Sequence, residues 1–393
     1  MSSSDSTTLT ANWSFPTRLL VGSGRSSELA ALCRELGLRR PLFVTDPGLC
    51  DLPMTIDRVA ELRAAGLAVE IFADVHGNPT GADVDAGVKA CKNGQHDGVI
   101  GFGGGSALDT AKAIALMVDQ ERPLWDFEDV GDNWKRAVAD AILPVIAVPT
   151  TAGTGSEVGR ASVITREQDH RKLIIFHPHM LPAVVILDPE VTRSLPADLT
   201  AATGLDAFSH CFEAWCAPGY HPMADGIALE GMRLIAEALP RAYANGDDLE
   251  ARTDMLVAAS MGATAFQKGL GAVHAISHPV GAIHHTHHGL TNAIVLPYVM
   301  QFNRTAIADR MQPLARVLGV QGEDFEAVYE WVIDFLQHFG IPSTLADIGV
   351  DITHADDIGR LGEIDPPAAT NPVPVTAADL RNIFMQAVQG PRA

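Results

Sequence analysis

The sequence predicts an α/β domain with a parallel sheet, followed by an all-α domain. Over residues 16–189, short apolar runs alternate with amphipathic segments of helical periodicity, which is typical of parallel strands covered by helices. From residue 195 onward, alternating β-branched runs are almost absent and long apolar-periodic segments prevail. We therefore place a boundary near residue 190, with an α/β domain at 1–190 and a helical domain at 191–393.

Individual elements follow from the same periodicities. The predicted strands are residues 42–45, 68–72, 98–102, 145–148, 172–176 and 184–187. Helical periodicity between them covers residues 25–38, 55–65, 82–92 and 106–118, and in the second half residues 225–238, 248–265 and 324–339. Thr376 and Asp379 form a capping-box pattern, which predicts the start of the last helix.

Length and charge limit the class of protein. A chain of 393 residues with 47% hydrophobic content can build two cores, and a net charge of -20 would repel nucleic acid and anionic membranes. The polar N-terminus lacks a signal-peptide pattern, and no apolar run approaches the ~20 residues of a membrane span. We expect a soluble protein with a short disordered tail. Five cysteines without a disulfide-framework spacing favour a reducing cytoplasm.

Histidines are concentrated in the segment GAVHAISHPVGAIHHTHHGLTNAIVLPYVM, residues 271–300. His274 and His278 lie four residues apart and would share one face of a helix, as would Asp206 and His210 in TGLDAFSHCFEAW. Imidazole and carboxylate groups suit a divalent first-row metal. A lone histidine on an apolar helix is usually a core residue, but two such pairs favour a metal site.

A glycine-rich turn in VIGFGGGSALDTAKAIA joins a predicted strand to a predicted helix. Glycine amides and the positive end of the helix dipole would hold a diphosphate there despite the acidity of the chain. The alternative is purely structural, because Ser106 and Asp109 also match a capping pattern that needs no ligand.

Two further features fit a dinucleotide. Asp46 closes the strand LFVTD, where a carboxylate can bind ribose hydroxyls and repel a 2′-phosphate, which favours NAD over NADP. The alternative for Asp46 is a turn residue before Pro47-Gly48. The loop PTTAGTGSE offers the hydroxyls and small side chains of Thr150, Thr151 and Thr154 to a flat cofactor.

Three motifs occur in fixed order: GGGSALDTAK, PTTAGTGSE, and the D-x-x-x-H pair followed by HAISHPVGA and HHGLTNAIVLPYVM. This order resembles the iron-containing (group III) alcohol dehydrogenase family over nearly the whole chain. Asn78-Pro79-Thr80 and Asn371-Pro372 are supporting matches. The resemblance implies a dinucleotide-binding α/β domain, a helical metal-binding domain in a dehydroquinate synthase-like layout, and a homodimer or larger homo-oligomer.

The resemblance also assigns roles to residues. The metal ligands would be Asp206, His210, His274 and His288, which replaces the pairing of His274 with His278 that spacing alone suggests. His278 and Asp109 would be catalytic, beside the substrate and the nicotinamide respectively. The remaining histidines, His284, His285 and His287, are expected at the rim or behind the ligands. The predicted cofactor-binding residues are Asp46, Asn78, Gly104, Gly105, Ser106, Asp109, Thr150, Thr151, Thr154 and Lys172. For Lys172 the alternative is an exposed lysine at a strand edge.

We expect an NAD-dependent enzyme that interconverts a primary alcohol and its aldehyde, with Fe(2+) as Lewis acid and Zn(2+) as the alternative metal. His278 would relay the hydroxyl proton. The resemblance implies a cleft between the two domains that holds the metal and the nicotinamide. Either Lys268 or Arg160, if it faces this cleft, would pair with a substrate carboxylate. That favours a short ω-hydroxy acid such as 4-hydroxybutyrate, with a simple primary alcohol as the alternative. For Lys268 itself, the other interpretation is a solvated cation at a helix end.

Three other classes remain at this stage. A metal- and NAD-dependent lyase of the dehydroquinate synthase type shares the layout, but it would need several basic residues around its substrate. A metal-dependent hydrolase would use the same ligands without NAD. A metal-storage protein leaves both glycine-rich loops unexplained.

Overall fold

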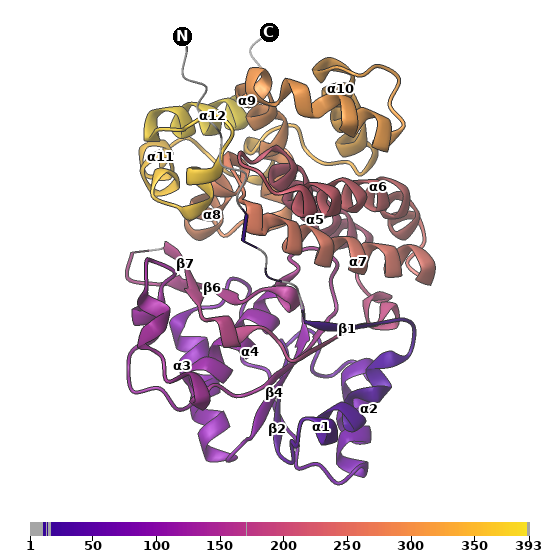
Figure 1. Cartoon of the computed structure of the whole chain (residues 1–393), viewed down its shortest axis with the longest axis vertical. Helices are drawn as coiled ribbons and strands as arrows, with labels where there is room; N and C mark the ends of the chain where they lie inside the picture. The colour runs from indigo at the N-terminus through magenta and orange to yellow at the C-terminus, as the bar shows by residue number, and fades with distance from the viewer. Residues whose placement is uncertain (1–10, 13, 15–16, 170, 391–393) are drawn as a thin grey trace, which may run out of the picture.

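The computed structural model describes residues 11–12, 14, 17–169 and 171–390. Two domains are stacked along the long axis of the molecule, with the α/β domain at one end and the helices of the second half at the other (Figure 1). The tail predicted at the N-terminus lies mostly outside the described residues. Among the described helices, none is both long enough and apolar enough to cross a membrane.

Six parallel strands form the sheet of the first domain, in the order β1-β8-β5-β4-β2-β3. The predicted parallel sheet is thereby confirmed. The strand bounds are β1 (Arg18–Val21), β2 (Pro41–Val44), β3 (Glu70–Phe72), β4 (Gly98–Gly103), β5 (Val145–Pro149) and β8 (Val184–Leu187). Strand β1 is absent from the prediction, because one four-residue run gives little periodicity.

Helices cover both faces of this sheet. Successive residues of a strand point to opposite faces of the sheet, so alternate residues pack against the two helix layers. Phe43 and Ile100 pack on the side of α1 (Leu29–Glu35) and α2 (Pro53–Ala64). Leu42 and Val99 pack on the side of α3 (Gly81–Asn93) and α4 (Gly105–Met117). The predicted helices match within a few residues, except that residues 25–38 divide into the 3-10 turn η1 (Arg25–Glu28) and α1.

Two strands form a separate antiparallel hairpin, β6 (Ala161–Arg166) and β7 (Arg171–Phe176). This corrects the sequence analysis in two respects. Residues 172–176 do not join the parallel sheet, and residues 161–166 form a strand where only a loop is predicted. Both strands alternate between buried and partly exposed residues, which is typical of antiparallel strands with one covered face.

The second half of the chain is helical, as predicted. Its helices share one core and are α5 (Ala197–Cys216), α6 (Pro222–Ala244), α7 (Leu249–Ala265), α8 (Ala272–His284), α9 (His288–Leu318), α10 (Phe325–His338), α11 (Ala355–Glu363) and α12 (Ala377–Gln389). The capping box of Thr376 and Asp379 is confirmed at the start of α12. Helix α8 runs through Pro279 to His284. The turn η7 (Pro189–Thr192) joins β8 to this half, and we keep the division at residue 190 as a proposal.

Candidate metal and cofactor site

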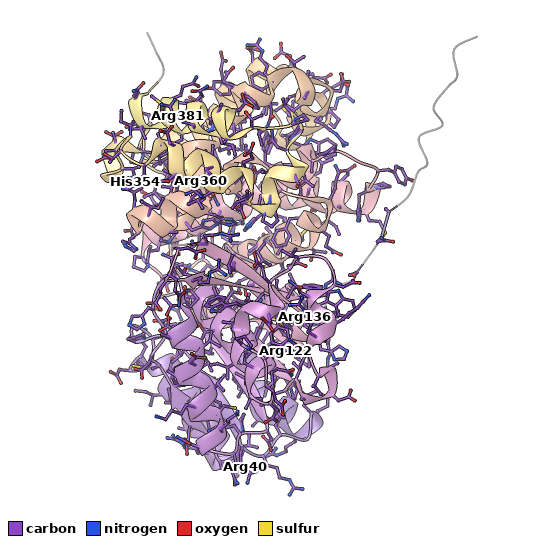
Figure 2. The ribbon with its side chains drawn as sticks, turned by 90° about the vertical axis from the view of Figure 1, so that its left-hand side faces the viewer. Arg40, Arg122, Arg136, His354, Arg360 and Arg381 are labelled. Carbon is purple, nitrogen blue, oxygen red and sulfur yellow. The ribbon has the colours of Figure 1, made fainter. Side chains whose placement is uncertain are left out.

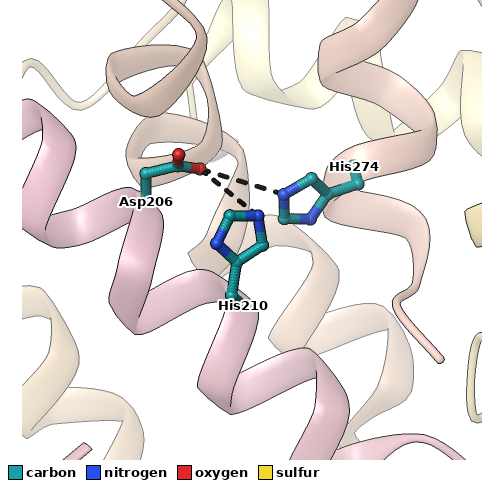
Figure 3. A group of neighbouring side chains, drawn as sticks. All are labelled: Asp206, His210 and His274. Atoms are coloured by element: carbon teal, nitrogen blue, oxygen red, sulfur yellow. Dashed lines mark ion pairs between the residues drawn. The ribbon is translucent and has the colours of Figure 1, made fainter. Parts of the chain in front are cut away.

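Three side chains from two helices converge in the core of the helical domain. Asp206 and His210 lie one turn apart on α5, and His274 comes from α8 (Figure 3). Each offers one ligand atom, and these atoms lie within 4.8 Å of one another. All three residues are at most 5% exposed. The helical spacing of Asp206 and His210 therefore directs both side chains at one point, as the sequence indicates.

His288 completes the group from the first residue of α9. Its Nε2 lies 3.7 Å from Oδ1 of Asp206, and Nε2 of both His210 and His274 lies 3.9 Å from the same oxygen. Asn292, one turn further along α9, donates from Nδ2 to this oxygen at 2.8 Å. The four residues that the family resemblance assigns as ligands are thus together.

This set of donors fits a divalent metal. Three imidazole nitrogens and one carboxylate oxygen are borderline ligands of the kind that Fe(2+) and Zn(2+) accept. Four ligands about 2.0–2.2 Å from a tetrahedral ion stand roughly 3.3–3.6 Å apart. The distances of 3.7–3.9 Å from Asp206 to the three imidazoles need only a small contraction.

Burial controls the protonation of these histidines. Desolvation lowers the pKa of His210 to about 4 and that of His288 well below its usual range, so both rings are neutral at neutral pH. A neutral ring keeps the lone pair that a metal requires. At His274, desolvation also lowers the pKa, but the carboxylates of Glu213 and Asp206 outweigh it and raise the pKa overall.

His278 lies next to this group but faces a cleft. Its ring centroid is 5.4 Å from that of His288, and its Nδ1 is 2.6 Å from Oδ2 of Asp365. The cleft lies between β7 and the helices α8 and α11. The arrangement matches the expectation that His278 stands beside the substrate, which remains a proposal.

Lys172 enters the same cleft from β7. Its Nζ reaches α8, where it would lie 3.3 Å from a Cβ atom at Gly281. Burial lowers the pKa of this ammonium group to about 8, while Asp206, Asp365 and Asp109 act in the opposite direction. Lys172 is therefore not the exposed strand-edge lysine of the alternative interpretation.

The remaining histidines form the short connection between α8 and α9. His284 is the last residue of α8, His285 follows with a left-handed φ of 55°, and His287 caps α9 by accepting from the amide of Leu290. This tight turn returns the chain so that His288 lies beside α8. The structure gives these residues a part in the turn itself, and His285 and His287 are exposed.

The glycine-rich loop lies at the carboxyl end of β4. Helix α4 begins at Gly105, and its N-cap Gly104 supplies no side-chain cap. The first-turn amides are therefore available to an anion. The capping alternative for Ser106 and Asp109 is wrong, because Ser106 lies inside the helix.

Asp109 instead joins α4 to neighbouring segments. Its carboxylate accepts from Oγ of Ser156 at 2.5 Å and from the amide of Val163 at 3.0 Å, and it pairs with Lys112 at 3.1 Å. These bonds fix β6 and the loop PTTAGTGSE, residues 149–157, against α4. We call this segment the threonine-rich loop. The predicted place of Asp109 near the nicotinamide remains a proposal.

The threonine-rich loop packs directly on the glycine-rich loop. A Cβ atom at Gly105 would lie 2.6 Å from Thr154, and one at Gly104 would lie 3.4 Å from Thr151. The same loop touches α5, since a Cβ atom at Gly153 would lie 2.8 Å from Thr203 on that helix. The two predicted cofactor loops, including Thr150 at the end of β5, therefore lie between α4 and α5.

Asp46 makes the turn contact that the alternative interpretation predicts. Oδ1 accepts from the amide of Gly48 at 2.9 Å, as a turn residue would. Oδ2 lies on the other side, 3.4 Å from where a Cβ atom at Gly103 would stand. The carboxylate thus borders the glycine-rich loop, and its contact with a ribose remains a proposal. Asn78 adopts a left-handed φ of 58° before α3, and its contact with the cofactor remains a proposal.

Neither cation proposed for a substrate carboxylate faces the cleft. Lys268 is buried and pairs with Asp225 at 2.5 Å, so it is neither a cleft residue nor a solvated helix-end cation. Arg160 lies over the ring of Phe176 at 5.5 Å and is not among the residues that line the cleft. The ion pair with Asp225 cannot be predicted from spacing, because Asp225 lies 43 positions before Lys268.

Three further polar residues support the site. Glu213 accepts from Nδ1 of His274, Asn292 donates to Asp206, and Asn371 accepts from the amide of Ala272 at the start of α8. Neither Glu213 nor Asn292 is predicted as a site residue, and Asn371 is predicted only as a family match. A signal exists for Glu213, which follows Asp206 and His210 at helical spacing on α5.

Several surface cations lie away from the glycine-rich loop. Arg40, Arg122 and Arg136 lie on the α/β domain, whereas His354, Arg360 and Arg381 lie on the helical domain (Figure 2). Several are paired, as Arg122 with Asp126 at 3.0 Å and Arg381 with Asp356 at 2.5 Å. An anionic cofactor must therefore depend on the local amides and dipole of α4.

The chain is similar to known proteins over both domains. Residues 16–189 match the family described as iron-containing alcohol dehydrogenase, and residues 200–388 match the C-terminal domain of the Fe-containing alcohol dehydrogenase family. The 4-hydroxybutyrate dehydrogenase of Cupriavidus necator is 38% identical over 95% of this chain and 98% of its own length. The NAD-dependent methanol dehydrogenase of Bacillus methanolicus is 36% identical over 96% of this chain and 100% of its own length. A crystal structure of 1,3-propanediol oxidoreductase superposes with a TM-score of 0.91 at 32% identity. The match covers 96% of this chain and 100% of that structure's chain.

Asp46→Asn tests the ribose contact. Asparagine keeps an oxygen for the amide of Gly48 but removes the charge that repels a 2′-phosphate. We expect the ratio of the Kd values for NADPH and NADH to fall about 10-fold or more, as the loss of a charged hydrogen bond worth about 1.5–3 kcal/mol allows. Fluorescence titration measures both values. Asp51→Asn on the same exposed loop is the control, and an unchanged ratio in Asp46→Asn would leave Asp46 with its turn role alone.

Lys268→Ala tests the buried ion pair. Removing the ammonium group leaves Arg310, 3.2 Å away, as the partner of Asp225, so the free energy of unfolding should fall by about 2 kcal/mol, as the loss of a buried charged hydrogen bond predicts. Denaturant unfolding measures this loss. Lys135→Ala, which removes an exposed pair with Asp132, should cost under about 1 kcal/mol. A Lys268→Ala protein of normal stability with a raised KM would return this lysine to the cleft.

Proposed function

Since this chain belongs to the iron-containing alcohol dehydrogenase family and interconverts alcohols and aldehydes with NAD as its cofactor, we propose that its substrate is a short ω-hydroxy acid such as 4-hydroxybutyrate. The alcohol would bind in the cleft beside His278 and Lys172. The observation that carries this proposal is that the cleft holds Lys172, a cation that no carboxylate pairs with among the described residues.

We propose that Asp206, His210, His274 and His288 hold the iron ion. When bound, Fe(2+) supplies Lewis acidity, which makes the substrate hydroxyl more acidic. The glycine-rich loop would hold the diphosphate of NAD at the N-terminus of α4, and Thr150, Thr151 and Thr154 would line the cofactor. Contact between the threonine-rich loop and α5 would bring the nicotinamide toward the substrate.

His278 is the proposed proton carrier. The carboxylate of Asp365 at Nδ1 favours the tautomer with its proton on that nitrogen, which leaves Nε2 as the acceptor. A histidine in this orientation can take the hydroxyl proton and pass it to solvent through the cleft. Asp365 thereby positions the ring without contacting the substrate.

Lys172 is the proposed partner of the substrate carboxylate. Arg171 and Lys172 are the cations among the residues that line the cleft, and Arg171 already lies 3.6 Å from Glu128. Within the part of the chain that the structure describes, no carboxylate pairs with the ammonium group of Lys172. It therefore replaces Lys268 and Arg160 in this role. The same group is the predicted contact of the cofactor's ribose, so its function needs a direct test.

A simple primary alcohol is the second candidate. Several cleft residues are apolar, and Val130 and Ile364 are 58% and 54% exposed. Three carboxylates, those of Glu128, Asp129 and Asp365, also line the cleft and would disfavour an anionic substrate. These features favour an uncharged alkyl chain.

We also propose a cytoplasmic location and a homodimer or larger homo-oligomer. All five cysteines are free thiols, which agrees with a reducing compartment. The oligomer rests on the resemblance to the family.

His274→Ala tests the metal site. Loss of one of four ligands should remove the metal, and kcat/KM should therefore fall by at least about 100-fold. Metal analysis of the purified protein and NADH oxidation measure the two effects. His76→Ala, on an exposed histidine of the α/β domain, is the control. A metal-free His274→Ala protein with normal turnover would refute the mechanism.

Lys172→Met tests the substrate. With Fe(2+)-loaded protein, NADH oxidation by succinic semialdehyde should have a KM about 10–100-fold higher in the variant, whereas the KM for propanal should not change. Because burial lowers the pKa of Lys172 to about 8, the KM of the native protein for the semialdehyde should stay low below pH 8 and rise as the lysine loses its proton above it.

Arg160→Met is the matched control for this experiment and should leave both substrates unaffected. If Lys172→Met instead weakens NADH binding and affects both aldehydes equally, the lysine serves the cofactor. If the native protein prefers propanal, the substrate is a simple alcohol.

A further inference from the structure

Glu213 is a buried carboxylate close to the proposed metal site but outside its ligands. It lies on α5 and is 5% exposed. Oε2 is 2.5 Å from Nδ1 of His274, and Oε1 accepts from the amide of Val273 at 2.8 Å. Both oxygens are therefore directed at the first turn of α8.

Helix α5 presents three polar residues on one face. Asp206 and His210 direct ligand atoms at the centre of the group, while Glu213, one turn beyond His210, reaches behind His274. The two nitrogens of the His274 ring thus have different partners, since Nε2 faces Nδ2 of Asn292 at 3.2 Å and Oδ1 of Asp206 at 3.9 Å, whereas Nδ1 faces Glu213. A carboxylate at Nδ1 keeps the proton there and leaves the lone pair of Nε2 free for a metal.

The start of α8 is held by side chains from other segments. Its N-cap, Gly271, supplies no side-chain cap. Asn371 accepts from the amide of Ala272 at 3.0 Å, in the position next to the bond from Val273 to Glu213. A Cβ atom at Gly271 would lie 2.8 Å from Asn371 and 2.9 Å from Glu213, so glycine permits both approaches. Asn371 is fixed in turn by two bonds with Asn303 at 2.8 and 2.9 Å.

Charge balance supports the same role. The four proposed ligands carry one negative charge between them, that of Asp206, whereas the ion carries two positive charges. Glu213 adds the second negative charge within the same buried group. Buried charges are costly unless they are compensated, so this carboxylate favours a divalent ion over an empty site.

We propose that Glu213 is a positioning residue of the metal site, which fixes the tautomer and orientation of His274 and balances the charge of the ion. The inference rests on the proposed ligand set. Asn371 and Gly271 assist by fixing the end of α8 on which His274 stands.

Glu213→Gln in the full-length chain tests this role. Glutamine has the same shape and can still accept from the amide of Val273, but it lacks the charge. We expect the Kd for Co(2+), measured by chelator competition on the metal-free protein, to rise about 10- to 100-fold, and the Co(2+) absorption spectrum to change. Glu157→Gln is the matched control, because Glu157 is also buried and bonds to Ser260 on α7. It should keep the native affinity.

The outcomes separate the two proposals. Native Co(2+) affinity and spectrum in Glu213→Gln would overturn the role of Glu213, whereas a native chain that binds no Co(2+) would refute the ligand set itself. Gly271→Ala is the second variant, for use if Glu213→Gln does not fold. It keeps Glu213, but its added methyl group crowds the side chains of Glu213 and Asn371. A weakened Co(2+) affinity in Gly271→Ala supports the proposal, and an unchanged affinity contradicts it.

Discussion

The burial of acidic and imidazole groups on one face of α5 is the constraint on which the rest of the site depends. Asp206, His210 and Glu213 are each at most 5% exposed within an otherwise apolar core. Such groups are costly to bury unless every one has a partner. Asn292 satisfies Asp206, and the start of α8 satisfies Glu213. The positions of α8 and α9 against α5 are therefore tied to the polar groups of α5.

Close packing of these helices requires residues without side chains. A Cβ atom at Gly289 would lie 2.2 Å from the carbonyl oxygen of Ala202, so α9 can approach α5 only with glycine beside His288. Gly271 has the same function at the start of α8. The glycine that follows His288 in the sequence is thus part of the physical reason that this histidine, rather than one of its neighbours, reaches the group.

The cofactor region solves a different electrostatic problem. A chain with a net charge of -20 must hold an anionic cofactor, and its surface cations are spread over both domains (Figure 2). Free amides at the start of α4 provide local positive potential instead. Asp109 and Lys112 hold the threonine-rich loop against α4, and this loop extends to α5. The cofactor region and the buried polar face of α5 are thereby mechanically connected.

The sequence by itself determined the layout and most elements, and through the family resemblance it predicted the four candidate ligands that the structure brings together. Periodicity records which face of a strand or helix is buried, and an i, i+4 pair on one helix fixes a direction, so the parallel sheet, the helical half and the Asp206–His210 pair follow from local patterns. Only the tertiary structure decided what depends on contacts between distant segments. It pairs β6 with β7, buries Lys268 against Asp225, and directs Lys172 into the cleft and Glu213 at His274. Spacing along the chain carries no information on such partners, because their proximity arises only when separate helices and strands pack together.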